Sequence, residues 1–243
     1  MNEYGFSQGI ARHASESAFP NLWRGLAGLW VPSAGIQGQS LRDFSNRGNT
    51  AAFVNTPTWV GGPRGKALNF VSASSQYLSV PYSSAIGLTG DLTLMARFRT
   101  NSAGQQQGLI ERYTQSGSGK NGYVLRLTSA GKLLGDTLDA TGPSGSAATG
   151  ATAVTAGRWT HGAFVFTRAN NLIYLDGKQD ASTANTRVPT AGATPLYLGA
   201  RGDDHLLTFS GLLDDLRVYA RALSAQEIFQ CAAGACPLTL ARP

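Results

Sequence analysis

The sequence is poor in charged residues and in the residue types that carry chemistry. Asp, Glu, Lys and Arg together make up 14% of the 243 residues, which is low for a domain with a helical surface. The chain holds two cysteines and three histidines, too few for a disulfide framework or a zinc cluster. No apolar run approaches the ~20 residues that a membrane-spanning helix needs, so we expect no membrane span.

The scarcity of glutamate argues against a glycoside hydrolase, which places two carboxylates across a cleft. Glu3 and Glu16 precede the first expected strand, Glu227 belongs to a helix cap, and Glu111 stands alone. No histidine lies at the spacing of a known catalytic motif. We therefore expect no catalytic residues and no enzymatic activity, with a glycoside hydrolase as the least favoured alternative.

Net charge and cysteine content indicate which kinds of partner and which cellular compartment to expect. The net charge is +6, but the arginines are scattered and form no basic run, so we expect no specific nucleic-acid partner. Cys231 and Cys236 are interpreted as free thiols in a reducing compartment. The first eight residues have no basic and apolar regions like those of a signal peptide, so we expect the protein to be made in a cytoplasm.

The sequence is rich in glycine and in short runs of alternating apolar residues. Thirty glycines and ten prolines separate apolar runs of strand length. In the clearest run, residues 91–99, one face is apolar and the other, with Thr93 and Met95, is expected to be wetter. Asp176-Gly177 is a strong hairpin signal. The pattern predicts an all-β fold, an antiparallel β-sandwich.

One short helix is expected near the C-terminus, because Ser224 and Glu227 have the spacing of a capping box. No internal repeat or linker interrupts residues 25–232, which we predict to be one domain. We interpret residues 233–243 as a tail and residues 1–24 as an N-terminal arm.

The arm ends in large apolar side chains, Phe19, Leu22 and Trp23, which would be costly to leave in water. Two interpretations stay open. The arm packs on its own domain, or it docks on a neighbouring subunit in an assembly.

Eight short motifs resemble the laminin-G-like jelly-roll domains of the concanavalin A-like lectin/glucanase superfamily. Gly157-Arg158-Trp159-Thr160-His161 is similar to the family's Gly-x-Trp-x-His strand, and Tyr174-Leu175-Asp176-Gly177 to its Tyr-Val-Asp-Gly turn. The other six motifs are residues 28–30, 43–49, 65–70, 76–81, 89–94 and 198–201, and all eight occur in the order that the family has them. The resemblance covers about residues 25–230 and implies a jelly-roll sandwich.

A looser similarity concerns residues 20–25 and Arg47, which resemble laminin-G-like proteins encoded by bacteriophages. It implies a non-catalytic virion component, decorating a capsid or belonging to a tail or fibre. Its partners would be other virion proteins and further copies of the chain. The alternative is a free carbohydrate-binding or adhesion module.

The family resemblance also implies a structural calcium ion. Its oxygen ligands would be Asp43, Asn49 and one of Asp214 or Asp215, and we name Asp214. Neighbouring strand residues point to opposite faces, so both aspartates cannot reach one ion. In the alternative interpretation, Asp43 caps a turn and Asp214 pairs with Arg47, a cation standing where the family has a small or polar residue.

Glycan binding would need an exposed aromatic side chain with amides beside it. The candidates are Tyr82 and Tyr113, with Gln107 and Asn121 as the amide partners.

Overall fold

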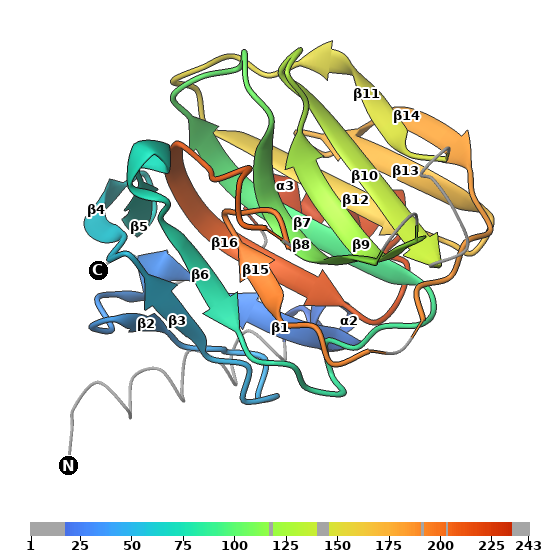
Figure 1. The fold of residues 1–243 in the computed structure, drawn as a ribbon, viewed down its shortest axis with the longest axis horizontal. Coiled ribbons are helices and arrows are strands. Elements are labelled where there is room, and N and C mark those ends of the chain that lie inside the picture. Colours follow the sequence, from blue (N-terminus) through green and yellow to red (C-terminus); the bar gives the residue numbers. More distant parts are fainter. Residues whose placement is uncertain (1–17, 117–118, 140–145, 191, 203, 235–243) are drawn as a thin grey trace.

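The computed structural model describes residues 18–116, 119–139, 146–190, 192–202 and 204–234. Two antiparallel sheets of eight strands each lie face to face (Figure 1). The predicted all-β sandwich is confirmed. Cys236, His13, Glu3 and Glu16 lie outside the described residues.

Sheet A has β7 and β16 at its centre, and β1 continues it by pairing with β16. In order across the sheet, its strands are β14 (Lys178–Ala184), β13 (Asn170–Leu175), β12 (Thr160–Phe166), β7 (Leu92–Thr100), β16 (Gly211–Tyr219), β5 (Gly65–Phe70) and β4 (Thr58–Gly62), with β1 (Leu26–Trp30) beside β16.

Sheet B covers the other side of the core. In order, its strands are β11 (Ala148–Ala153), β10 (Lys132–Asp139), β9 (Gly119–Leu127), β8 (Gln107–Ser116), β15 (Leu196–Leu198), β6 (Tyr77–Val80), β3 (Ala51–Val54) and β2 (Ser40–Leu41). Two 3-10 turns, Pro32–Ala34 and Ser72–Ser74, connect strands of the two sheets.

Side-chain alternation along β7 fills the space between the sheets, as predicted. Leu92, Leu94, Ala96 and Phe98 lie in the main core with side chains from both sheets. The opposite face of β7 is drier than expected, because Thr93 and Met95 are also fully buried. A second apolar cluster, which includes Met95, Val165 and Ile228, covers that outer face of sheet A.

Helix α3 (Ala225–Ala233) supplies part of this cover. The Ser224 hydroxyl accepts from the backbone N–H of Glu227, and the Glu227 carboxylate accepts from the N–H of Ser224, so the predicted capping box is present. Ile228 and Cys231 point into the cluster on sheet A. Neither α3 nor α2 (Pro20–Trp23), the helices of the described part, has the length that crossing a bilayer requires.

The C-terminal end of the expected arm belongs to the domain. Leu22 is fully buried in the outer cluster, and Phe19 and Trp23 pack against it. The Tyr219 hydroxyl donates to the Leu22 carbonyl over 2.9 Å, and the Arg221 guanidinium donates to the carbonyl of Asn21. Of the two interpretations, the described residues therefore follow the first: they pack on their own domain.

Strand β16 departs from regular alternation at its aspartate pair. The pairing register with β7 shifts between Asp214 and Arg217, and Asp215 has a φ of 52°. Asp215 is thus the extra residue of a β-bulge. The expectation that Asp214 and Asp215 point to opposite faces is wrong, because the bulge brings Asp214, Asp215 and Arg217 to the outer face of sheet A.

Candidate functional site

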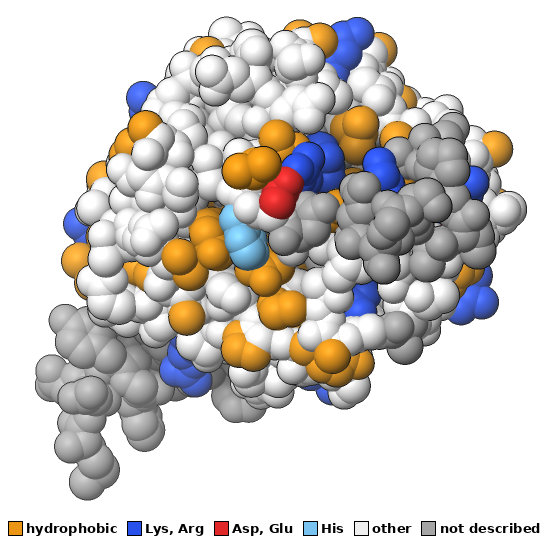
Figure 2. Space-filling view, viewed as in Figure 1, with side chains coloured by type: hydrophobic (Ala, Val, Ile, Leu, Met, Phe, Trp, Pro, Cys, Tyr) orange, Lys and Arg blue, Asp and Glu red, His pale blue; other side chains and the backbone are white. Residues whose placement is uncertain are grey.

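The outer face of sheet B, turned away from the core, combines aromatic rings with buried charge. Figure 2 shows this face: apolar side chains surround a histidine and an acidic side chain, with basic side chains close by. Register places the contributing residues side by side, since Tyr197 of β15 lies opposite Glu111 of β8, and Glu111 lies opposite Val124 of β9.

Three rings form an aromatic group at one end of this face. Tyr77 of β6 and Tyr197 of β15 meet edge to face at 5.8 Å between ring centroids. The His205 ring stacks on Tyr77 at 4.8 Å and meets Tyr197 at 4.6 Å. All three side chains are partly exposed. We call Tyr77, Tyr197 and His205 the ring cluster.

A small pocket of about 100 Å³ lies on the same face. Its charged lining comes from Lys120, Arg126 and Asp136, and the ring of Tyr113 lies 5.8 Å from the Arg126 guanidinium. Apolar side chains complete the wall: Val124, Leu134, Leu138 and Ala147. The pocket therefore offers both signs of charge on an apolar floor.

Glu111 connects the pocket with the ring cluster. Its Oε2 lies 2.8 Å from Nη2 of Arg126, while its side chain is 0% exposed. Burial raises the pKa of Glu111 to about 7, although the Arg126 guanidinium opposes the shift. Burial likewise raises the pKa of Asp136 to about 6, against hydrogen bonding from Asn171.

Several polar atoms around the pocket have no hydrogen-bond partner among the residues that the structure describes. They are Oε1 of Glu111, Oδ2 of Asp136, Nε of Arg126 and Oγ of Ser146. These atoms have almost no exposed surface, so the charged groups that the pocket itself presents are the side chains of its lining, Lys120, Arg126 and Asp136. Because Glu111 has no exposed surface, the two carboxyl groups do not face each other across an open cleft, as glycosidic cleavage requires.

The four predicted ligand residues do not form one site. Tyr113 lines the pocket. Tyr82 is 42% exposed but lies in the loop after β6, with the Arg112 guanidinium 5.9 Å from its ring. Asn121 is paired with the backbone of Thr190 in both directions.

Gln107 was predicted as an amide partner for a ligand, and the structure contradicts this. Its side chain is buried, and its amide nitrogen donates to Thr100 Oγ1 and the Ser102 carbonyl. Its amide oxygen accepts from the backbone N–H of Ser210. Gln107 therefore ties the loop after β7 to the segment before β16 instead of facing solvent.

The predicted metal ligands are already engaged as hydrogen-bond acceptors. Asp43 Oδ1 accepts from the N–H groups of Leu29 and Ser45, and Oδ2 accepts from the Ser45 hydroxyl and the Asn49 N–H, at 2.8–3.0 Å. Four donors therefore use the lone pairs that calcium would need. This arrangement fits a turn-capping carboxylate and does not fit a calcium ligand.

Asn49 and Asp214, the other two predicted metal ligands, also make hydrogen bonds within the protein. Asn49 Oδ1 accepts from the Ser83 hydroxyl over 2.6 Å, and its amide nitrogen donates to the Ala27 carbonyl. Asp214 accepts from the Ser33 N–H, and burial, followed by the neighbouring Asp215, raises its pKa to about 6. Among the described residues, no three His, Cys, Asp or Glu side chains gather as a metal site.

Tyr197, His205, Arg126 and Asp136 were not identified from the sequence as site residues. They come from strands and loops far apart in the chain, and only the strand order of sheet B brings them to one face. The alternation in residues 196–198 was a usable signal for an outward Tyr197, but not for its neighbours.

Comparison with solved structures supports the architecture. A domain of an extracellular arabinanase from Geobacillus stearothermophilus, in complex with arabinotriose, superposes with a TM-score of 0.65 at 19% identity, over 85% of this chain and 98% of that domain. The binding domain of Paraclostridial Mosquitocidal Protein 1 gives 0.67 at 16% identity, over 87% of this chain and 52% of its own.

A Trypanosoma rangeli sialidase in complex with sialic acid gives a TM-score of 0.62 at 16% identity, over 86% of this chain and 32% of the sialidase. The chain thus spans about half of the mosquitocidal binding domain and about a third of the sialidase. No curated protein sequence matches. A family model matches residues 72–229, more than half of the chain, and the chain belongs to the concanavalin A-like lectin/glucanases superfamily.

Proposed function

We propose that the protein is a non-catalytic glycan-binding domain and that its ligand lies on the outer face of sheet B. The observation that carries the proposal is the ring cluster of Tyr77, Tyr197 and His205 on the same face as the charged pocket. Sugar rings stack their C–H faces on aromatic side chains, while hydroxyl groups bind carboxylates and guanidinium groups.

The pocket supplies the polar half of this recognition. Lys120 and Arg126, which line the pocket, donate to ring or hydroxyl oxygens of the sugar, and the Asp136 carboxylate in the same lining accepts from a hydroxyl group. At about 100 Å³ the pocket admits part of one sugar residue, so the remainder of an oligosaccharide lies along the face toward the ring cluster.

A glycan array with the full chain tests the proposal. It should include arabino-oligosaccharides and sialylated oligosaccharides, because two structurally similar proteins are seen in complex with arabinotriose and with sialic acid. We expect Tyr197→Ala to weaken binding of any positive glycan about tenfold or more, because it removes one stacking ring. Tyr82→Ala is the matched control, since Tyr82 is an exposed tyrosine outside the ring cluster. Absence of binding to every glycan, or equal effects of the two variants, would contradict the proposal.

We propose separately that this domain works in a phage particle, as a capsid, tail or fibre component made in the host cytoplasm. The support is the similarity of residues 20–25 and Arg47 to phage-encoded laminin-G-like proteins. Mass spectrometry of purified particles tests it: the chain should be present at a fixed stoichiometry. A chain found only outside particles would favour a free adhesion module.

A further inference from the structure

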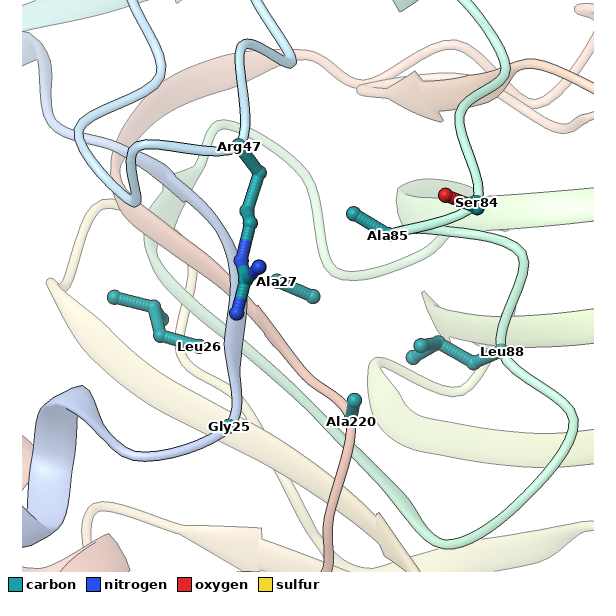
Figure 3. A pocket seen from close by; sticks show the side chains of 8 residues that line it. All are labelled: Gly25, Leu26, Ala27, Arg47, Ser84, Ala85, Leu88 and Ala220. Atoms are coloured by element: carbon teal, nitrogen blue, oxygen red, sulfur yellow. The ribbon is translucent and has the colours of Figure 1, made fainter.

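A second cavity lies at the side of the sandwich, remote in its lining residues from the ring cluster and the charged pocket. It measures about 270 Å³ and opens between the start of β1, the loop that follows β2 and the loop that joins β6 to β7 (Figure 3). Its lining residues are Gly25, Leu26, Ala27, Arg47, Ser84, Ala85, Leu88 and Ala220. This volume is close to the lower end of the range for small-ligand sites.

The cavity is apolar except at its mouth. Leu26, Ala27 and Leu88 are buried and form the wall, and within the described part of the chain no acidic residue lines the cavity. The Arg47 side chain runs from its loop along β1 toward Leu26, and Ser84 lies on the opposite side of the cavity (Figure 3). One guanidinium and one hydroxyl therefore face an apolar space.

The turn that carries Arg47 is fixed by hydrogen bonds. Asn46 and Gly48 adopt positive φ values of 66° and 75°, and the Arg47 N–H donates to the Ser45 hydroxyl. The Asp43 carboxylate accepts four hydrogen bonds within and next to this turn, as described above. The backbone position from which Arg47 reaches over the cavity is thus set before any ligand arrives.

The charge of Arg47 is not balanced by the residues that the structure describes. No ion pair or hydrogen bond joins its guanidinium to them, and the nearest acid in sequence, Asp43, is saturated with other donors. A second guanidinium near Gly25, that of Arg221, is neutralised by both carboxylate oxygens of Glu227. The mouth of the cavity therefore carries one uncompensated positive charge.

We propose that this cavity binds a small organic carboxylate, with the carboxylate on Arg47 and an apolar body against Leu26, Ala27 and Leu88. Guanidinium and carboxylate match as a planar, two-pronged pair. A single cation with one hydroxyl balances one negative charge, which favours a carboxylate over a doubly charged phosphate. An acidic N-acetylated sugar and a non-sugar acid both present this carboxylate chemistry at a size of one ring, and the test below distinguishes them.

Titration of the isotope-labelled full chain, followed by amide NMR shifts, tests the proposal. The probes are N-acetylneuraminic acid, phenylacetate and neutral N-acetylglucosamine. We expect at least one carboxylate to shift the amides of residues 25–27, 47 and 84–88, and N-acetylglucosamine to leave them unchanged. Arg47→Gln should raise the Kd about tenfold or more, since it removes the charge-assisted pair. Ala85→Leu, which fills the cavity but keeps Arg47, should weaken binding as well.

Arg42→Gln is the matched control, because Arg42 is exposed in the same region, carries the same charge and does not line the cavity. Its Kd should equal that of the unsubstituted chain. Shifts with N-acetylneuraminic acid alone support an acidic sugar as the ligand, and shifts with phenylacetate alone support a non-sugar acid. No shift with either carboxylate, or equal binding by Arg47→Gln and Arg42→Gln, overturns the proposal. Tyr197→Ala should not change this Kd, so the two sites fail or succeed independently.

Discussion

The Arg217 guanidinium forms a bidentate ion pair with the carboxylate of Asp215, two residues earlier in the same strand. Nε lies 2.6 Å from Oδ1 and Nη2 lies 2.7 Å from Oδ2. Both side chains are almost fully buried beneath α3, and Nη1 of Arg217 also donates to Sγ of Cys231 over 3.2 Å. Residues two apart in a strand share a face, so regular alternation already brings Asp215 beside Arg217, and the bulge adds Asp214 to the same face.

Arg217→Met should lower the free energy of unfolding by about 3–5 kcal/mol, since it leaves the Asp215 charge buried without this partner. Urea denaturation measures the effect. Arg158→Met is the matched control: Arg158 lies 2.8 Å from Asp176 in an exposed pair, and its loss should cost less than about 1 kcal/mol. The double variant Asp215→Asn, Arg217→Met should recover part of the loss. Equal costs for the two arginines would show that burial of the Asp215–Arg217 pair is unimportant.

Calcium should leave the thermal midpoint of the protein unchanged, because the Asp43 oxygens are occupied by four donors. Differential scanning calorimetry in calcium and in EDTA measures this directly, since an ion that binds the folded state raises the midpoint. A rise in calcium that EDTA reverses, and that Asp43→Asn abolishes, would show that the turn exchanges its hydrogen bonds for a metal ion.

His161 should make the fold sensitive to mild acid. Burial lowers the pKa of His161 to about 4, and the Arg217 and Arg64 charges act in the same direction, against Asp215 and Asp176. Because this value lies below the ordinary 6.5, the stabilising contribution is complete above pH 6.5 and is lost as the pH falls toward 4. The loss should approach about 1.4 kcal/mol per pH unit within that window.

The measurement is the difference between the unsubstituted chain and His161→Asn in urea denaturation from pH 7 to pH 4. A difference is needed because Glu111, whose pKa is raised to about 7, has the opposite effect on stability. Its contribution to the stability of the folded protein is complete below pH 4.5 and is lost as the pH rises from 4.5 to 7. A difference that is constant with pH would show that His161 is solvated and titrates normally.

Leu22→Ala should destabilise the isolated domain by about 2–5 kcal/mol, as expected for a fully buried leucine. Ile36→Ala is the control, since Ile36 is exposed and should change stability by less than about 0.5 kcal/mol. The measurement is made on monomeric protein at low concentration. If both variants behave alike there, Leu22 is stabilised by a neighbouring subunit and not by its own domain.

Local patterns predicted the elements that depend on local chemistry. Ser224 and Glu227 form the expected cap, and Asp176 and Gly177 take positive φ values of 48° and 83° in the hairpin between β13 and β14. Alternation in residues 91–99 identified the core face of β7. The outer face was misjudged because its cover comes from α3 and residues 18–24, which the strand's own sequence does not reveal.

The candidate sites depended on information that the sequence does not display. The side chains of Tyr77, Glu111, Arg126 and Tyr197 come together through strand order and register. Asp43 has the residue type of a metal ligand, but the donors that occupy it come from Leu29, Ser45 and Asn49 once the turn closes. A bulge at Asp215 has no local signature, since an aspartate tolerates positive φ without requiring it.

The extra residue in β16 contributes to the charge on the outer face of the strand but not to the apolar packing on its inner face. Leu213 and Leu216, on either side of the aspartates, both pack in the main core, so a chain shortened by residue 215 would keep each remaining side chain on its present side. Such a deletion would remove an anion from beneath α3 without altering the shape of the interior. It would also leave the Arg217 guanidinium buried without its carboxylate partner, so the extra residue of β16 is retained by a buried charge and not by the hydrophobic packing of the sandwich.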